Sequence, residues 1–356
     1  MIDAKSVIHK LESTHNASDE ELLFLLGGDY DASVLFEAAD RVRRKVYAGE
    51  VYIRGLIEIS NYCRNNCLYC GIRASNPNVC RYRLTKEQIL SCCASGYELG
   101  FRTFVMQGGE DAVFDDDTMC DMVEAIKANH PDCAVTLSLG ERSRDSYMRL
   151  FDAGADRYLL RHETANSRHY ASLHPSSMKL EARKQCLFDL KDIGYQVGSG
   201  FMVGSPEQTP ECLLADLRFL QILEPDMIGI GPFISHKDTP FADCANGSLE
   251  LTLTLVAMLR LLFPHALIPA TTALGTIAAD GRERALRAGA NVVMPNLSPQ
   301  SVREHYSLYD NKAHSGAEAA ESLALLKKQV SQAGYEVVVA RGDAKKGAVS
   351  LNIHNV

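Results

Sequence analysis

Short apolar runs rich in β-branched residues alternate with amphipathic, helix-length segments along most of the chain from residue 51 onward. One helical segment, "TKEQILSCCASGYELG", starts with Thr85 and Gln88 at the two positions of a capping box. Several helical segments pass into the next apolar run through a glycine-containing turn, as in "AGADRY" and "DIGYQV". The eight predicted strands are residues 51–60, 101–108, 134–140, 156–163, 196–204, 227–234, 267–275 and 291–296.

Eight strand–helix units at regular spacing predict a parallel sheet closed into a (β/α)8 barrel of the TIM type, an α/β fold. Residues 1–50 are expected to form helices packed on the barrel, which itself spans residues 51–310. Residues 311–356 are expected to add a C-terminal helix and a tail to the same domain, because no low-complexity linker divides the chain. The basic stretch "ARGDAKKGA" (340–348) is interpreted as a solvated loop.

Composition narrows the class of protein further. The 356 residues carry a formal net charge of −8, which disfavours a nucleic-acid-binding face, since phosphate binding needs clustered Lys and Arg. No apolar run reaches the roughly 18 residues that a membrane span requires. The N-terminal stretch lacks the basic-then-apolar layout of a signal peptide, so we expect a cytoplasmic location and no membrane partner.

Polar clusters follow several of the predicted strands. They are "QGGED", "SLGE", "RHETAN" and "PATTALGT", each at the carboxyl end of an otherwise apolar run. In a (β/α)8 barrel these ends meet at one face, where the active site lies. The clusters therefore predict one shared site rather than scattered surface polarity.

Eleven cysteines without a secretion signal argue against a disulfide framework. Three of them, Cys63, Cys67 and Cys70, directly follow the first predicted strand with the spacing C-x3-C-x2-C. The other eight show no ligand spacing and are interpreted as packed or partly exposed thiols.

Three thiolates can hold three corners of a [4Fe–4S] cluster and leave one iron open, which is typical of a catalytic rather than a structural metal site. A zinc site completed by a distant Cys or His is the alternative, although zinc ligands normally come in pairs. An amine and a carboxylate together would chelate the open iron, and the methionyl end of S-adenosylmethionine (SAM) offers that pair.

The motif resembles that of the radical SAM superfamily, including the aromatic Tyr69 just before the last cysteine. Further segments, among them "RGLIEISNYCRNNCLYCGIR", "VMQGGED", "DRYLLRHETAN" and "PATTALGT", resemble the HydE family of [FeFe]-hydrogenase maturases over residues 45–310. The resemblance implies reductive cleavage of SAM to a 5′-deoxyadenosyl radical, during assembly of the hydrogenase di-iron subcluster. The implied substrate is a small cysteine-containing iron precursor.

The resemblance also implies residue roles. Cys63, Cys67 and Cys70 match the ligands of the [4Fe–4S] cluster. Glu163 matches the acceptor for the SAM ribose hydroxyls and Arg183 the arginine facing the SAM carboxylate; an acid near a helix N-terminus and a solvated surface arginine are the respective alternatives. The other positions that match SAM-binding residues are Tyr69, Gln107, Gly108, Gly109 and Ser138.

Substrate-binding positions of the family match Thr136, Arg161, Thr271, Thr272 and Tyr306. Adjacent threonines point to opposite faces of a strand, so Thr271 and Thr272 can both line a cavity only if the strand has ended. The implied partners are a GTPase scaffold, a second radical SAM maturase, and a reductant such as ferredoxin or flavodoxin.

The chain departs from some family members in having no cysteine after Cys244, so a second, C-terminal cluster is expected to be absent. A methylornithine-synthase-like mutase is the alternative within the radical SAM enzymes. A non-catalytic iron–sulfur scaffold is the alternative from another class, although such carriers normally close the cluster with four protein ligands.

Overall fold

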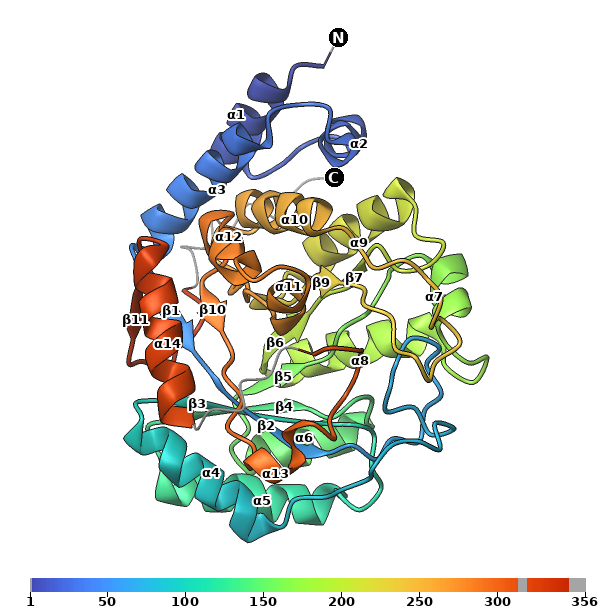
Figure 1. The fold of residues 1–356 in the computed structure, drawn as a ribbon, viewed down its shortest axis with the longest axis vertical. Helices are drawn as coiled ribbons and strands as arrows, with labels where there is room; N and C mark the ends of the chain where they lie inside the picture. Colours follow the sequence, from blue (N-terminus) through green and yellow to red (C-terminus); the bar gives the residue numbers. More distant parts are fainter. Residues whose placement is uncertain (1, 313–318, 346–356) are drawn as a thin grey trace.

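The barrel predicted from the sequence is present in the computed structural model, which describes residues 2–312 and 319–345. Six strands form one parallel sheet in which each strand pairs with the next barrel strand along the chain (Figure 1). They are β2 (Gly55–Ser60), β3 (Thr103–Gly108), β4 (Ala134–Ser138), β5 (Arg157–Leu159), β6 (Gln196–Ser199) and β8 (Met227–Ile228). Their side chains are almost entirely buried, as expected for a parallel sheet covered on both faces.

Single parallel bridges close the barrel between β8 and β2. Met227 pairs with Leu267, Pro269 with Val292 of β10 (Val292–Val293), and Asn296 with Leu56. The (β/α)8 prediction is therefore confirmed. Proline has no amide hydrogen to donate, so Pro269 weakens the hydrogen bonding of residues 267–269, which take the seventh strand position of the barrel. The predicted strand 267–275 is wrong in its second half, because α11 (Thr272–Ile277) begins there.

Three of the predicted strands are interrupted. The strand predicted over residues 51–60 is divided at Arg54 into β1 (Glu50–Ile53) and β2, which belong to different sheets. After β6 the chain continues as β7 (Met202–Val203), and after β8 as β9 (Gly231–Pro232), which pairs with β7. The break lies at Gly200, where φ is +154° and a Cβ atom would lie 1.9 Å from the Gly229 carbonyl oxygen. Only glycine allows the two backbones to approach this closely.

A second parallel sheet extends the barrel at its closing edge. In this sheet β1 (Glu50–Ile53) lies between β10 and β11 (Glu336–Val338), a strand that the sequence did not predict. The chain then reaches the amino end of β5, where Asp343 forms an ion pair with Arg157 at 2.5 Å and Arg341 pairs with Asp156 at 2.9 Å. The interpretation of 340–348 as a solvated loop is therefore wrong for residues 341 and 343, and residues 346–348 lie outside the described part.

The helices form three groups. The helices that connect or flank the barrel strands are α4 (Lys86–Glu98), α5 (Asp116–Asn129), α6 (Arg144–Asp152), α8 (Leu180–Ile193), α9 (Pro210–Leu223), α10 (Leu249–Leu262), α12 (Gly281–Arg287) and α14 (Ala319–Gln332). Short helices after strand ends are α7 (Ser167–Leu173), α11 and α13 (Gln300–Arg303). The predicted capping box at Thr85 and Gln88 is present at the start of α4. Among the described helices, none has the length and apolar character needed to cross a bilayer.

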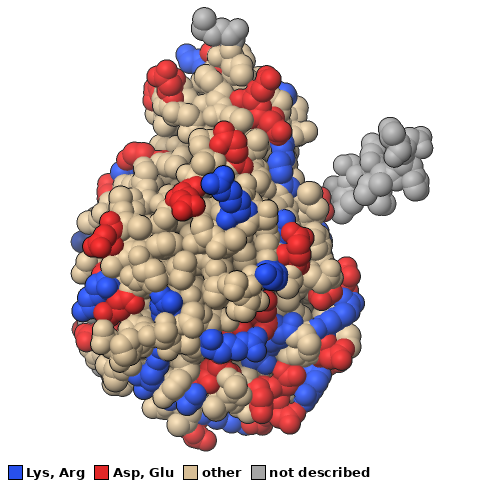
Figure 2. Space-filling model, turned by 90° about the vertical axis from the view of Figure 1, so that its right-hand side faces the viewer, with Lys and Arg blue, Asp and Glu red and all other residues tan. Residues whose placement is uncertain are grey.

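The N-terminal helices α1 (Ala4–Thr14), α2 (Asp19–Gly27) and α3 (Ala32–Tyr47) pack on α10, outside the barrel (Figure 1). This position explains why α10 is buried on every side from Thr252 to Leu262, since the barrel covers one side of it and the N-terminal helices the other. On the face shown in Figure 2, basic and acidic side chains are interspersed, without the broad basic area that nucleic acid binding requires.

Candidate active site

The three-cysteine loop begins where β2 ends, at the carboxyl end of the barrel. Backbone hydrogen bonds tie it to three other segments. The Leu68 amide donates to the Leu173 carbonyl at the end of α7 (2.9 Å), the Gly71 amide to Leu308 (2.9 Å) and the Arg64 amide to Glu110 (3.0 Å). Parts of the chain up to 237 residues apart therefore fix the loop over the barrel mouth.

Cys63, Cys67 and Cys70 are all partly buried. Burial raises the pKa of each thiol, that of Cys67 to about 12, and the neighbouring thiolate charges raise the pKa of Cys67 and Cys70 further. The mutual effect means that the three sulfurs are neighbours. Because iron binds thiolates, loading this site must displace three protons.

The donor set fits a [4Fe–4S] cluster better than a zinc ion. Within the described residues, no group of three or more His, Cys, Asp or Glu side chains converges as the ligands of a single metal ion would. In an iron–sulfur cubane each thiolate would bind a different iron, so three cysteines on one loop could serve the cluster without sharing a single metal ion. The three thiols lie on one loop over the barrel mouth, where a ligand of the remaining iron has access from the barrel.

Gly109 of the "QGGED" segment packs directly against this loop. A Cβ atom on Gly109 would lie 2.2 Å from the Tyr62 carbonyl oxygen and 2.7 Å from Cys63 Cβ, whereas one on Gly108 would meet nothing closer than 3.3 Å. The absence of a side chain at Gly109 therefore allows the three-cysteine loop to pack directly against this segment. Gln107, two residues earlier, donates a hydrogen bond to the Tyr306 hydroxyl at 3.3 Å, which joins a predicted SAM residue to a predicted substrate residue.

A cavity of about 200 Å³ lies under the loop and inside the barrel mouth. It brings together predicted residues from three different segments of the sequence. Those predicted from the sequence are Tyr69, Cys70, Arg161, Glu163, Thr271 and Thr272. Both threonines reach it because Thr271 is the N-cap residue of α11, so the strand has ended.

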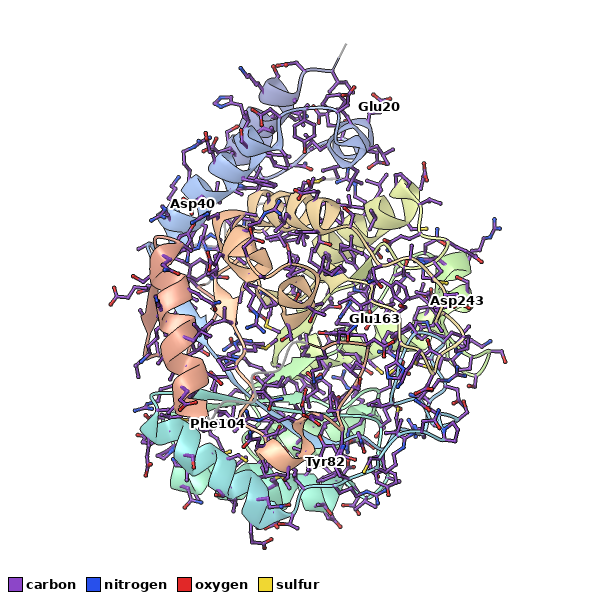
Figure 3. All side chains as sticks on the ribbon, viewed as in Figure 1. Glu20, Asp40, Tyr82, Phe104, Glu163 and Asp243 are labelled. Atoms are coloured by element: carbon purple, nitrogen blue, oxygen red, sulfur yellow. The ribbon has the colours of Figure 1, made fainter. Side chains whose placement is uncertain are left out.

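Glu163 lies inside the ring of helices (Figure 3) and forms an ion pair with Arg161 at 3.0 Å. The Oε2 atom of Glu163, which faces Arg161 Nη2 in this ion pair, is buried without an aligned hydrogen-bond donor, and Arg161 Nε is buried without an acceptor. Glu163 does not cap α7, whose N-cap is Asn166. The cavity therefore presents a carboxylate oxygen and a guanidinium with unused hydrogen-bonding capacity.

Arg183 is 8% exposed, so the alternative of a solvated surface arginine is wrong. Its Nη1 donates to the Arg161 carbonyl at 3.1 Å, and its Nε lies 2.6 Å from Glu141 Oε1. Ser138, the last residue of β4, pairs with Gln107 in register and is half-buried at the same end of the barrel.

Thr136 lies apart from the mouth cavity. It is two residues before Ser138 on β4 and lines a small separate cavity with Arg54, Arg157 and Met227, towards the amino ends of the strands. The structure therefore separates Thr136 from the other four residues predicted to bind substrate.

Sequence reasoning missed several residues of the site. Tyr309 lines the mouth cavity, and only its position three residues after Tyr306 hinted at this. His174 orients Tyr69: its Nδ1 donates to the Tyr170 carbonyl at 2.9 Å, so its Nε2 accepts from the Tyr69 hydroxyl at 3.2 Å.

A buried ion pair anchors the segment that carries Tyr306. Lys312 Nζ pairs with Glu58 on β2 and also donates to the Tyr306 carbonyl at 2.9 Å. Asn296 Nδ2 donates to the second oxygen of Glu58 at 2.8 Å. No local sequence pattern signals a contact between residues 254 positions apart.

Comparison with known sequences agrees with this geometry. Residues 57–220 match the profile of the Radical SAM superfamily. The chain is 50% identical over 278 residues to the [FeFe] hydrogenase maturase subunit HydE of Thermotoga maritima, covering 78% of this chain and 79% of that protein. It is 29% identical to 3-methylornithine synthase of Methanosarcina acetivorans over 82% of this chain and 83% of that protein.

Two solved structures share the fold. Methylornithine synthase (PylB) superposes with a TM-score of 0.82 at 26% identity, over 93% of this chain and 97% of that one. HydG, a maturase of the [FeFe]-hydrogenase, gives a TM-score of 0.80 at 21% identity, over 95% of this chain and 76% of that one. The extent and identity of the match to the Thermotoga protein place the chain, as a radical SAM enzyme, in the HydE family of [FeFe]-hydrogenase maturases.

Proposed function

We propose that the mouth cavity holds SAM next to a small cysteine-containing iron precursor, and that the enzyme acts on this precursor during assembly of the [FeFe]-hydrogenase di-iron subcluster. The observation that carries the proposal is the single cavity shared by Cys70 and Tyr69 of the cluster loop, the ion pair of Arg161 and Glu163, and the threonines at the start of α11. When bound, the [4Fe–4S] cluster of this family supplies the electron that cleaves SAM reductively.

The residues around the cavity would divide the work between them. Cys63, Cys67 and Cys70 hold the cluster, and Gly109 lets their loop approach β3. Glu163 accepts hydrogen bonds from the ribose diol of SAM, for which a carboxylate is suited. Arg183, already buried beside the loop, binds the SAM carboxylate with its fork of donors. Ser138, Gln107 and Gly108 complete this side of the site.

The substrate side is more cationic and hydroxylic. Arg161, with Thr271 and Thr272, would bind the carboxylate or another anionic group of the precursor, and Tyr306 would close the barrel end behind it. The remaining lining includes Met202, Phe233 and Leu308, which exclude water from a reactive intermediate. The cavity of about 200 Å³ is smaller than the roughly 300–1,000 Å³ of typical small-molecule sites, so SAM would extend beyond it towards Gln107, Ser138 and Arg183, and no macromolecule would enter.

The proposed setting includes three partners implied by the family: a GTPase scaffold that receives the product, a second radical SAM maturase, and a ferredoxin or flavodoxin reductant. Each of them would be recognised outside the cavity, which is too small for a protein chain.

Anaerobic reconstitution followed by dithionite reduction tests the chemistry. The wild type should bind four irons per chain and release 5′-deoxyadenosine from SAM. Cys67→Ala should lose both properties, whereas Cys80→Ala, which alters an exposed thiol outside the motif, should keep them. An intact cluster that binds SAM without producing 5′-deoxyadenosine would instead make the protein an iron–sulfur scaffold.

Complementation tests the biological role. The gene should restore active hydrogenase to cells that lack their HydE gene, and the purified enzyme should leave lysine unchanged. Conversion of lysine together with failed complementation would favour the methylornithine-synthase alternative, which the TM-score of 0.82 to that enzyme keeps relevant.

A further inference from the structure

Glu163 lies at the centre of a tight and unusual turn. Its φ is +65°, and the Thr164 amide donates across it to the His162 carbonyl at 2.8 Å, which is the hydrogen bond of a γ-turn. A residue with a Cβ atom is strained in this conformation, so the surrounding structure must hold it there. On the strand side, the Glu163 amide donates to Gly200 (3.1 Å) and its carbonyl accepts from Met202 (3.3 Å).

A buried polar network holds the turn from the opposite side. Asp216 projects from α9, is completely buried and accepts a hydrogen bond from the Ala165 amide, just after the turn. The same oxygen of Asp216 lies 3.3 Å from Nε2 of His162, just before the turn. The Nδ1 atom of His162 bonds Ser199 Oγ at 2.9 Å, and Ser199 donates to the Leu160 carbonyl at 3.0 Å.

The hydrogen bonds determine which nitrogen of His162 carries a proton. Ser199 uses its hydrogen on Leu160, so His162 Nδ1 is the donor and Nε2 of the neutral ring is free to accept. Burial lowers the pKa of His162 to about 3 and raises the pKa of Asp216. Both shifts favour a neutral pair in which the carboxyl group of Asp216 holds the proton that faces the ring.

Stability alone does not account for this pair. His162 is surrounded by apolar rings, with Phe219 edge-on at 4.9 Å and Phe201 at 5.8 Å. Replacing a buried polar pair in such a setting with apolar side chains is often neutral or stabilising. The network instead contacts the residues on both sides of Glu163, where it restricts the direction of the Glu163 side chain.

We propose that Asp216, acting with His162, is a positioning residue that holds Glu163 in the orientation in which its carboxylate reaches the ribose of SAM. The inference rests on the proposed function of Glu163 and adds to it the groups that make a strained turn persist. Neither residue touches the cavity, so their effect on SAM passes entirely through Glu163.

Calorimetric titration of SAM into the reconstituted, unreduced enzyme tests the proposal without relying on turnover. Asp216→Ala should weaken SAM binding about tenfold. Without Asp216, Glu163 can leave its strained conformation, and restoring that conformation on binding would cost about 1.4 kcal/mol, which is a factor of about ten in affinity. Asp216→Asn, which keeps an oxygen that accepts from the Ala165 amide but cannot also donate from that atom to His162, should weaken SAM binding less than Asp216→Ala does. The matched control is Asp156→Ala: Asp156 also accepts a backbone amide hydrogen, from Val135 at 2.8 Å, but at the far end of the barrel.

Two further measurements separate positioning from a general structural effect. L-Methionine lacks the ribose, so Asp216→Ala should leave its affinity unchanged. In a Glu163→Ala background, adding Asp216→Ala should have no further effect on SAM affinity. Equal weakening of methionine and SAM, or an undiminished effect in the Glu163→Ala background, would overturn the inference.

The remaining outcomes are also decisive. If Glu163→Ala alone leaves SAM affinity unchanged, the proposed ribose contact is wrong. If Glu163→Ala weakens SAM binding and Asp216→Ala does not, only the positioning role is wrong. Should Asp216→Ala fail to fold, Ser199→Ala, which removes the Nδ1 partner of His162 together with the hydroxyl hydrogen bond to the Leu160 carbonyl, should weaken SAM binding severalfold with methionine affinity unchanged, and an unaltered SAM affinity would overturn the inference.

Discussion

Replacing Gly109 with alanine should damage the cluster site, although the change adds one methyl group and touches no ligand. The new Cβ would lie 2.2 Å from the Tyr62 carbonyl oxygen, a backbone atom that cannot rotate away. An ordinary contact needs about 1 Å more, so the Tyr62 carbonyl must shift by about that distance. Cys63 follows Tyr62 directly, and its own Cβ would be 2.7 Å from the new methyl group, so the first cluster ligand must move too.

The magnitude follows from overpacking against backbone. Inserting a methyl group into a well-packed site costs about 1–3 kcal/mol, and backbone that relaxes poorly places Gly109→Ala in the upper half of this range. When the groups that hold a metal ligand in place are displaced, metal affinity typically falls about 10–100-fold. We therefore expect normal expression, a modest loss of thermal stability and a clear loss of iron.

The assay is iron and sulfide content per chain after anaerobic reconstitution, together with the visible and electron paramagnetic resonance spectra of the cluster. Gly108→Ala is the matched control, because its Cβ would meet nothing closer than 3.3 Å, which requires shifts of only a few tenths of an ångström. Equal iron content in the two variants would refute the view that the glycine at position 109 is required by the approach of the cluster loop.

Three further predictions follow from the buried contacts. Burial lowers the pKa of His174 to about 3, so the stability contributed by this neutral imidazole is complete above about pH 6.5 and falls as pH decreases; burial also lowers the pKa of His162, but the raised pKa of its partner Asp216 opposes that effect over the same range. Urea unfolding of the metal-free protein should therefore show a loss of about 1 kcal/mol between pH 7 and 5.5, and a flat or rising profile would contradict this. Asp343→Ala leaves the buried Arg157 guanidinium without its carboxylate and should destabilise the fold by about 1–2 kcal/mol in thermal unfolding, discounted because Asp343 is 41% exposed. Tyr69→Phe removes the hydrogen bond to His174 and should lower stability by about 1 kcal/mol while SAM affinity in calorimetry changes less than about threefold, since the ring remains in the cavity.

Local pattern was enough to predict the mouth of the barrel. Apolar runs ending in polar clusters placed Arg161 and Glu163 at one strand end and Thr271 at another, and parallel strands must bring such ends to the same face. The boundary after Thr271 was missed, because the apolar residues of "PATTALGT" fit a strand and the first turn of a helix equally well. The alternation therefore predicted which segments meet but not where each strand stops.

Contacts between distant segments were beyond prediction from this sequence. Lys312 belongs to no periodic segment, and its partner Glu58 precedes it by 254 residues, so the ion pair leaves no local signal. Arg341 and Asp343 look like solvated charges in the sequence, yet β11 carries them to the amino end of the barrel. Arg183 was ambiguous for the same reason, since a helical pattern does not reveal that a loop will cover that face.

Arg161 illustrates how the sequence and the structure constrain the ligand together. A charge near the end of an apolar strand predicts a partner, and Glu163 supplies it at 3.0 Å, so the cavity has no net charge from this pair. Yet Nε of Arg161 and Oε2 of Glu163 are buried without aligned partners, which is costly for charged groups unless something else binds them. A ligand with both acceptors for the arginine and hydroxyl donors for the glutamate would satisfy each group without separating the pair. SAM and an anionic cysteine-bearing substrate bound side by side meet this requirement, whereas an uncharged apolar molecule does not.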